Sequence, residues 1–354
     1  MLSRWFLILT LQLGCAAKGN IRSVETIQGI PDRIAFGSCA RSIKPQPILN
    51  TIVDAKPDLF VYLGDNIYAD TRLAFLMRAK YHQLAIKKPF KRLRANVPVL
   101  SIWDDHDYGG NDDGVENPFK KTSERIFLDF WEVPKDSERR SRPGIYGHHV
   151  FEENGRRLQL ILLDTRYFRD KATKNRRRDI KGPQAQYRRK YKPDPDPEKT
   201  VLGESQWTWL EARLREPADV TIIASSTQFA HAYNGLESWN NFPLEKARML
   251  KLIEETGANG VIFTSGDVHW GEISKETKGV VYPIYDLTAS GLTQIHDWAS
   301  SNKKRVGKSL KELHFGVIDF DWEKADPEIC LRLLDIKGKI RREACTLLSE
   351  ISAS

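Results

Sequence analysis

Short apolar runs alternate with stretches of helical periodicity along the first three quarters of the chain. The clearest run is Leu59 to Leu63, where five consecutive apolar residues predict a strand that is buried on both faces. Gly64 and Asp65 follow at once and predict a sharp turn. Runs of the same kind predict further strands over residues 34–36, 97–103, 220–224 and 260–265.

Apolar residues at intervals of three and four predict helices between these strands. In one of them Leu73, Leu76, Met77 and Leu84 recur at helical spacing, which predicts a helix over residues 73–86. Gly257 is the expected cap of the last helix of this series. Similar patterns predict helices over residues 45–55, 120–131 and 244–255, and one that opens at residue 202.

The remaining pattern favours antiparallel β structure. Residues 144–151 and 157–163 predict a hairpin that turns at Glu153-Asn154-Gly155, and the chain from residue 280 onward reads mostly as strands. Strands that alternate with helices, an inserted hairpin and a β-rich end together predict an α/β (α+β) fold of two stacked sheets flanked by helices.

The last two cysteines are expected to pair. If Lys337-Gly338 is a two-residue turn, Cys330 and Cys345 stand opposite each other across the hairpin. Directly opposed strand residues lie within disulfide range, whereas a slip of one residue would separate them.

The first residues have the character of a leader. An apolar run that ends before Gly14 is too short to span a bilayer but suits a signal peptide over residues 1–17. Leu13-Gly14-Cys15 also resembles a lipoprotein box, so cleavage before Cys15 with lipid attachment is the alternative. Both readings predict export, to the periplasm, the medium or a lipid anchor at the cell envelope. Cys39, Cys330 and Cys345 would remain, an odd number in an oxidising compartment.

Positive charge is concentrated in one segment of a chain whose formal net charge is +8. The segment that begins at Lys171 and ends at Lys192 is rich in Lys and Arg and poor in acids. It is either a solvated surface loop or a strip that attracts an anionic polymer or a membrane surface. We find no specific nucleic-acid-binding motif.

Candidate chemistry gathers where the predicted core strands end. In open α/β sheets, ligands bind at the carboxyl ends of the strands. Four of the predicted strand ends carry Cys, Asp, Tyr or His. Any one of them could be an ordinary turn, but four together are typical of a multi-metal site. The residues concerned are Cys39, Asp65, Tyr68, Asp104, Asp105, His106, Asp267 and His269.

These residue types suit phosphoryl chemistry. Asp65 could bridge two cations, which would hold an oxygen nucleophile and the phosphoryl oxygens, although it could also be a turn residue. His106 could bind a phosphoryl oxygen or protonate the leaving group, or be a structural His beside the metal ligands. Cys39 and Tyr68 are strongly donating anions that suit a highly charged transition metal, but each could simply pack in the core.

The order of short motifs resembles a known family. Within residues 33–270 it is similar to the calcineurin-like metallophosphoesterase superfamily, and its departures from the superfamily pattern resemble the PhoD-like alkaline phosphatase D family. The motifs are Ser38-Cys39, Gly64-Asp65-Asn66-Ile67-Tyr68, Trp103-Asp104-Asp105-His106, Leu163-Asp164-Thr165-Arg166, Leu202-Gly203 with Gln206 and Trp209-Leu210, and Gly266-Asp267-Val268-His269.

The resemblance implies a four-layer αββα sandwich in a single domain over residues 28–354. It also implies a ferric ion held by Cys39, Asp65, Tyr68 and His269, and calcium near Asp65, Asp105 and Asp267 with Asn111 as a further ligand. Arg72 or Arg166 would clamp phosphate together with His106 and Asn111. Gln228 stands where the superfamily usually has a His, and no C-terminal helix that would cover the site is evident, so the pocket could admit diesters.

The leading hypothesis is therefore an exported metal-dependent phosphatase that hydrolyses phosphomonoesters, phosphodiesters or both, with Asp65, His106 and Arg166 in catalytic roles. A relative that acts on another ester is the second. The third is a non-catalytic, metal-containing protein that binds anionic cell-surface polymers through the basic segment.

Overall fold

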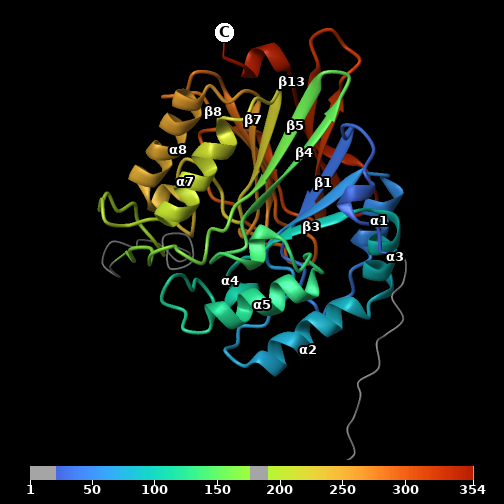
Figure 1. The fold of residues 1–354 in the computed structure, drawn as a ribbon, viewed down its shortest axis with the longest axis vertical. Coiled ribbons are helices and arrows are strands. Elements are labelled where there is room, and N and C mark those ends of the chain that lie inside the picture. The colour runs from blue at the N-terminus through green and yellow to red at the C-terminus, as the bar shows by residue number, and fades with distance from the viewer. Residues whose placement is uncertain (1–20, 176–189, 354) are drawn as a thin grey trace, which may run out of the picture.

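Two β-sheets lie face to face at the centre of the computed structural model, with helices on both outer sides (Figure 1). The structure describes residues 21–175 and 190–353. Gly316 in one sheet marks the close approach of the two, because a side chain there would lie 2.9 Å from Leu287 and 3.0 Å from Ala289 in the other. The predicted four-layer αββα sandwich is confirmed.

The first sheet has six strands in the order β13-β12-β11-β1-β2-β3. The three strands β1, β2 and β3 are parallel, and β11 pairs with β1 in the antiparallel direction. As the unbroken apolar run predicts, every residue of β2 is buried. The bounds are β1 (Arg33–Gly37), β2 (Leu59–Leu63), β3 (Val99–Ile102), β11 (His314–Asp321), β12 (Glu328–Asp335) and β13 (Ile340–Leu347).

The second sheet has seven strands in the order β10-β8-β9-β7-β6-β5-β4. The strands β5, β6, β7 and β9 are parallel, whereas the predicted hairpin of β4 and β5 is antiparallel. The sequence pattern missed β8 and β10. The bounds are β4 (Gly147–Glu153), β5 (Arg156–Leu162), β6 (Val220–Ala224), β7 (Val261–Ser265), β8 (Gly271–Glu276), β9 (Ile284–Ala289) and β10 (Arg305–Leu310).

Helices cover both outer faces, with α7 and α8 beside the second sheet and α1 to α5 around the first (Figure 1). All the predicted helices are present, and Gly257 caps α8 with a left-handed φ of 65°. The pattern missed α3 and the short helix α4. The bounds are α1 (Ile48–Asp54), α2 (Ala74–Ala85), α3 (Lys88–Asn96), α4 (Asp105–Tyr108), α5 (Lys120–Phe130), α7 (Gly203–Leu214) and α8 (Pro243–Thr256). Short 3-10 turns are η1 (Val24–Thr26), η2 (Glu138–Arg140), η4 (Trp239–Asn241) and η5 (Leu348–Ile351).

The apolar pattern over residues 73–86 needs one correction. Met77, together with Tyr81 and Leu84, forms the buried face of α2, but Leu73 and Leu76 are exposed. Leu73 precedes the first turn in an extended conformation, so it lies outside the helical repeat that the spacing assumed.

The C-terminal hairpin carries the predicted disulfide. Cys330 pairs with Cys345, and their strands β12 and β13 place the two residues directly opposite each other. The assumed two-residue turn is wrong, because Asp335 N–H donates to the Lys339 carbonyl and leaves a three-residue loop. An irregularity that begins after Leu333 shifts the register by one residue and restores the pairing.

Two sequence predictions fall largely outside the described residues. The proposed leader over residues 1–17 lies there, and so does most of the basic segment, at residues 176–189. Within the described ranges, the helices are all too short or too polar to cross a membrane.

Candidate metal centre

The candidate ligands lie on the loops that follow parallel strands of both sheets. Cys39 follows β1, Asp65 follows β2, Asp105 follows β3, and Asp267 and His269 follow β7. Except for Asp105, which begins α4, these residues have left-handed φ values, between 53° and 70°. Such values are uncommon outside glycine and cluster at functional sites, where surrounding contacts hold them.

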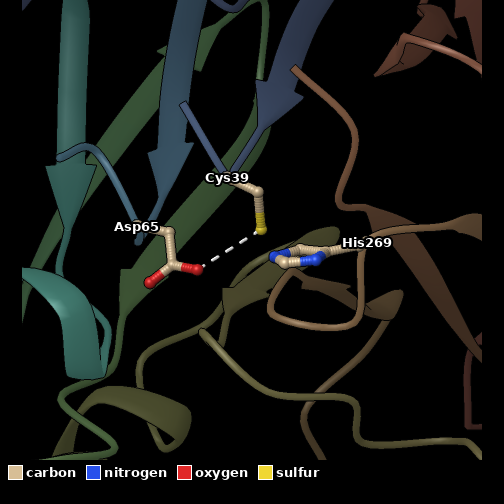
Figure 2. Close-up of side chains that lie close together, drawn as sticks. All are labelled: Cys39, Asp65 and His269. Atoms are coloured by element: carbon tan, nitrogen blue, oxygen red, sulfur yellow. Dashed lines mark hydrogen bonds between the residues drawn. The ribbon is translucent and has the colours of Figure 1, made fainter. Parts of the chain in front are cut away.

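Four donor groups converge on a first position. Cys39 Sγ lies 3.4 Å from Asp65 Oδ2, and His269 approaches from the opposite side (Figure 2). Tyr68 completes the group, because its hydroxyl lies 3.1 Å from Asp65 Oδ2 and 3.0 Å from His269 Nε2. Thiol, carboxylate, imidazole and phenol therefore meet at one point, as the sequence predicts.

Asp65 also belongs to a second group of potential metal ligands. One ligand atom from each of Asp65, Asp105 and His106 lies within 4.8 Å of the others, and the same holds for Asp104, Asp105 and Asp267. Asp65 Oδ1 is buried and accepts no hydrogen bond from the described residues. Oδ2 of Asp65 therefore lies in the group with Cys39 and Tyr68, whereas Oδ1 has no hydrogen-bond partner among the described residues. Such a carboxylate fits a position between two cations.

The electrostatics of the cluster favour a cation. Burial raises the pKa of Asp65 well above its usual range, and the neighbouring Cys39 raises it further. Burial likewise raises the pKa of the Cys39 thiol to about 12 and that of Asp267 well above its usual value. Because a bound cation stabilises the ionised form of each group, these residues fit metal ions.

A cavity of about 450 Å³ opens in front of these ligands. Carboxylates, imidazoles and aromatic rings line it. The lining residues are Asp65, Asp105, His106, Asn111, Asp112, Lys190, Tyr191, Leu236, Glu237, Asp267, Val268, His269, His296 and Trp298.

His106 is held in place on its far side. Its Nδ1 lies 2.6 Å from Asp70 Oδ1, and its ring packs on the Tyr68 ring with centroids 4.2 Å apart. Burial lowers the pKa of His106, but Asp105, Asp65 and Asp70 outweigh it and raise the pKa to about 11. Asp70 thus orients the imidazole at the cavity wall, where it can form a hydrogen bond with a molecule bound in the cavity.

The two arginines that were candidate phosphate clamps lie elsewhere. Arg166 is fully buried behind the carboxylates, where it pairs with Asp104 and, at 2.7 Å, with Glu237. Arg72 is exposed, pairs with Asp113 at 3.5 Å and is not among the residues lining the cavity. In this arrangement Arg166 orients carboxylates from behind, and of the residues proposed to hold phosphate only His106 and Asn111 face the cavity.

Gln228 does not replace the missing superfamily His as a ligand. Its amide donates to Glu272 at 2.8 Å and to Thr288 at 3.0 Å, inside the second sheet. It is therefore part of a buried polar network beside the site.

Several cavity residues were not singled out from the sequence. Asp112 forms a hydrogen bond to Tyr191 and an ion pair with Lys190, a member of the basic segment. Asp105, Asp112 and Glu237 form a further group of acids within 4.8 Å. The only sequence signal for Asp112 was the pair of acids at residues 112–113 in a loop rich in glycine, residues 108–114. Glu237 and His296 stand in stretches without a motif.

The fold and the convergent acids, His and Cys at the strand ends define a protein of the metallophosphoesterase class. A family model described as PhoD-like phosphatase matches residues 34–288, and the chain belongs to that family. Alkaline phosphatase D of Bacillus subtilis (strain 168) is 24% identical over 216 residues, which cover 54% of this chain and 34% of that protein. This chain thus spans about a third of the length of that curated relative.

Solved structures show the same fold. A structure of PhoD aligns with a TM-score of 0.66 at 16% identity and covers 91% of this chain and 69% of that one. GAP50, the anchor in the inner membrane complex of Plasmodium, has a TM-score of 0.56 at 11% identity, with 92% and 89% of the chains covered. A dimetal phosphatase from Danio rerio has a TM-score of 0.53 at 12% identity, with 90% and 100% covered.

Proposed function

We propose that this member of the PhoD-like family is a metal-dependent phosphatase that hydrolyses phosphomonoesters, phosphodiesters or both in the cavity in front of Asp65. The observation that carries the proposal is the position of Asp65, which belongs to two ligand groups at once. A carboxylate shared by two cations is characteristic of two-metal hydrolysis.

Two kinds of metal fit the two groups. Cys39, Asp65, Tyr68 and His269 offer soft and strongly donating atoms, and we assign ferric iron to them. Asp65 shares one cluster with Asp105, Asp105 shares another with Asp267, and Asn111 lies at the cavity wall. These four side chains offer oxygens, and we assign calcium to them. When bound, these ions would supply Lewis acidity toward the phosphoryl oxygens and lower the pKa of water.

The chain's own residues then perform positioning and proton transfer. His106, fixed by Asp70, carries a proton that it can donate to the oxygen of the departing alcohol. Asn111 lines the cavity, which supports a role in holding a phosphoryl oxygen. Arg166 acts through Asp104 and Asp105, which it orients from behind. Burial acts to raise the pKa of each carboxyl, and the charge of Arg166 opposes that effect.

We also propose that the protein is exported and that residues 1–17 are removed. The Cys330–Cys345 disulfide supports this proposal, because such bonds persist in oxidising compartments. The intact mass of the exported protein tests it: loss of the leader is expected, a diacylglycerol mass on Cys15 would select the lipoprotein form, and retained Met1 would contradict it.

The binding-protein alternative gains no support from the described part of the basic segment. Lys190 lies at the cavity wall and pairs with Asp112, and Lys171 lies 3.7 Å from Glu116. These two cations are directed toward acids of the same molecule.

Hydrolysis assays test the proposed activity. The purified protein should hydrolyse an aryl phosphate, a bis-aryl phosphate or both, and the ratio of the two rates decides between monoesters and diesters. Dialysis against a chelator should abolish turnover, and added iron and calcium should restore it. Full activity after metal removal, or no hydrolysis of either substrate by metal-replete protein, would contradict the proposal.

A further inference from the structure

The exposed side of α2 has an unusual composition. No Asp or Glu occurs between Asp70 and Asp104, whereas that interval contains eight basic residues. They are Arg72, Arg78, Lys80, Lys87, Lys88, Lys91, Arg92 and Arg94. The surface formed by α2 and the start of α3 therefore carries a positive charge that nearby residues of the same segment do not offset.

This helix also has a second apolar face. The buried face is formed by Met77, Tyr81 and Leu84. On the opposite side Phe75 and Ile86, three turns apart along the helix, are 66% and 53% exposed. A helix with apolar residues on both sides normally has a second partner.

Further apolar side chains extend this outer face. Leu73 and Leu76, at the start of the helix, are 52% and 41% exposed. Single exposed apolar residues are ordinary on proteins, but four within fourteen residues form a patch.

Most of the surrounding cations form no ion pair among the described residues. Arg92 and Arg94 pair with Asp54 and Glu132. The other cations on α2 and at the start of α3 form no ion pair with any residue in the described ranges. They are Arg78, Lys80, Lys87, Lys88 and Lys91, and we call them, together with Leu73, Phe75, Leu76 and Ile86, the α2 patch.

We propose that the α2 patch docks the protein on an anionic lipid bilayer surface. Apolar side chains flanked by free Lys and Arg are the composition of helices that lie in a membrane interface, where the rings and aliphatic chains enter between the lipids. The cations remain at the level of the anionic headgroups, and each adds to the attraction. A soluble polyanion would satisfy the cations but would offer nothing to Phe75 or Leu76.

The place of α2 in the molecule gives the docking a consequence. The helix runs along the lower margin of the molecule in Figure 1, outside α5. Its first turn follows closely after Asp70, the residue that holds His106. Docking would therefore bring the candidate metal centre near the membrane surface.

Vesicle cosedimentation tests the proposal and needs no turnover, so its failure would leave the proposed phosphatase activity untouched. Vesicles with 30% phosphatidylglycerol should bind the protein about tenfold more tightly than pure phosphatidylcholine, with the difference shrinking at high salt. The variant Phe75→Gln with Leu76→Gln should lose most of this binding, and so should Arg78→Gln with Lys80→Gln and Lys88→Gln. The matched control is Val281→Gln with Leu347→Gln, which changes two exposed apolar residues away from α2 and should bind like wild type.

A labelled variant measures insertion directly. The labelled protein should lack residues 1–17, which contain Cys15. Because Cys39 is buried and Cys330 is paired with Cys345, a thiol introduced as Phe75→Cys then accepts an environment-sensitive dye selectively. Its emission should shift to the blue with anionic vesicles. The proposal would be overturned by the absence of a shift or by equal binding to neutral and anionic vesicles. It would also be overturned if soluble polyphosphate bound as tightly as vesicles and this binding survived the Phe75→Gln and Leu76→Gln changes.

Discussion

The hydroxyl of Tyr68 lies 3.0 Å from Nε2 of His269, although 201 residues separate the two in the sequence. The same hydroxyl lies 3.1 Å from Asp65, so a single oxygen links a candidate metal ligand after β2 to one after β7. The two sheets therefore contribute to one donor group, and its integrity depends on contacts between them.

Cys39→Ser should weaken metal binding at this donor group. Under our assignment to ferric iron, thiolate and phenolate ligands absorb visible light by charge transfer, so the metal-replete wild type should be coloured. Cys39→Ser should lower the iron content and shift or bleach the band, and activity should fall with the iron. Elemental analysis and an absorption spectrum of the same samples measure both effects.

Tyr68→Phe serves as the matched comparison, because it removes only the phenol oxygen and should alter the band independently. Both changes are nearly isosteric, so both variants should remain folded. Equal iron in wild type and Cys39→Ser, or an active, colourless wild type without iron, would contradict the assignment.

Asp70→Asn should slow turnover without emptying the metal positions. Asp70 accepts a hydrogen bond from His106 Nδ1 and does not belong to either of the shared ligand groups. Loss of its charge should reduce kcat about tenfold to a hundredfold. It should also move the alkaline limb of the pH–rate profile, where His106 loses the proton that it donates, to lower pH. Asn also tolerates the left-handed φ of 44° at this position. An unchanged pH profile would show that Asp70 has only a structural role.

Much of the site was predictable because strand ends are predictable. Continuous apolar runs such as residues 59–63 mark buried parallel strands, and the next residues must then lie at one edge of a sheet. This reasoning placed Cys39, Asp65 and His269 together correctly. The hairpin rule likewise predicted the Cys330–Cys345 pairing, although a three-residue loop and an irregular register replace the simple turn that it assumed.

Residues supplied by loops were not predictable in the same way. The short motif around Arg166 predicts that this residue matters, but only packing shows that it is buried among Asp104 and Glu237 instead of facing the cavity. Glu237 and His296 enter the cavity from irregular segments, whose paths depend on tertiary contacts. Apolar periodicity alone could not show that α2 is apolar on two sides.

The disulfide should contribute strongly to stability. Replacement of both cysteines, Cys330→Ala with Cys345→Ala, should lower the free energy of unfolding by about 3 kcal/mol, since the bond closes a loop between residues 15 apart. Denaturant unfolding of wild type and variant measures this loss. Metal content and activity should be retained, and a loss below roughly 1 kcal/mol would contradict the expectation.

His314 should make the protein sensitive to acid. Its Nδ1 donates to the Glu312 carbonyl at 2.7 Å, Nε2 is buried without a partner among the described residues, and burial lowers its pKa to about 4. In the unfolded chain the His314 imidazole has a pKa near 6.5, so as pH falls it takes up a proton there before it does so in the folded protein. The contribution of neutral His314 to the free energy of unfolding is therefore fully present above about pH 6.5 and is lost as pH falls toward 4.

Unfolding at pH 7.5 and pH 5 measures this effect. Between these values wild type should lose about 2 kcal/mol more than His314→Asn. The control variant His82→Asn alters an exposed imidazole on α2 and should show the same pH difference as wild type. Equal losses in wild type and His314→Asn would refute the prediction.

The shared position of Asp65 is the centre of this account, and Asp65→Asn tests it most directly. The change keeps the shape of the side chain and suits the φ of 53°, but it removes the charge between the two ligand groups. Metal content, phosphate-ester hydrolysis and thermal unfolding should be measured on the same preparations of wild type and variant. We expect a folded variant that has lost at least one metal per chain and more than a thousandfold in activity; wild-type metal content together with wild-type activity would contradict the account.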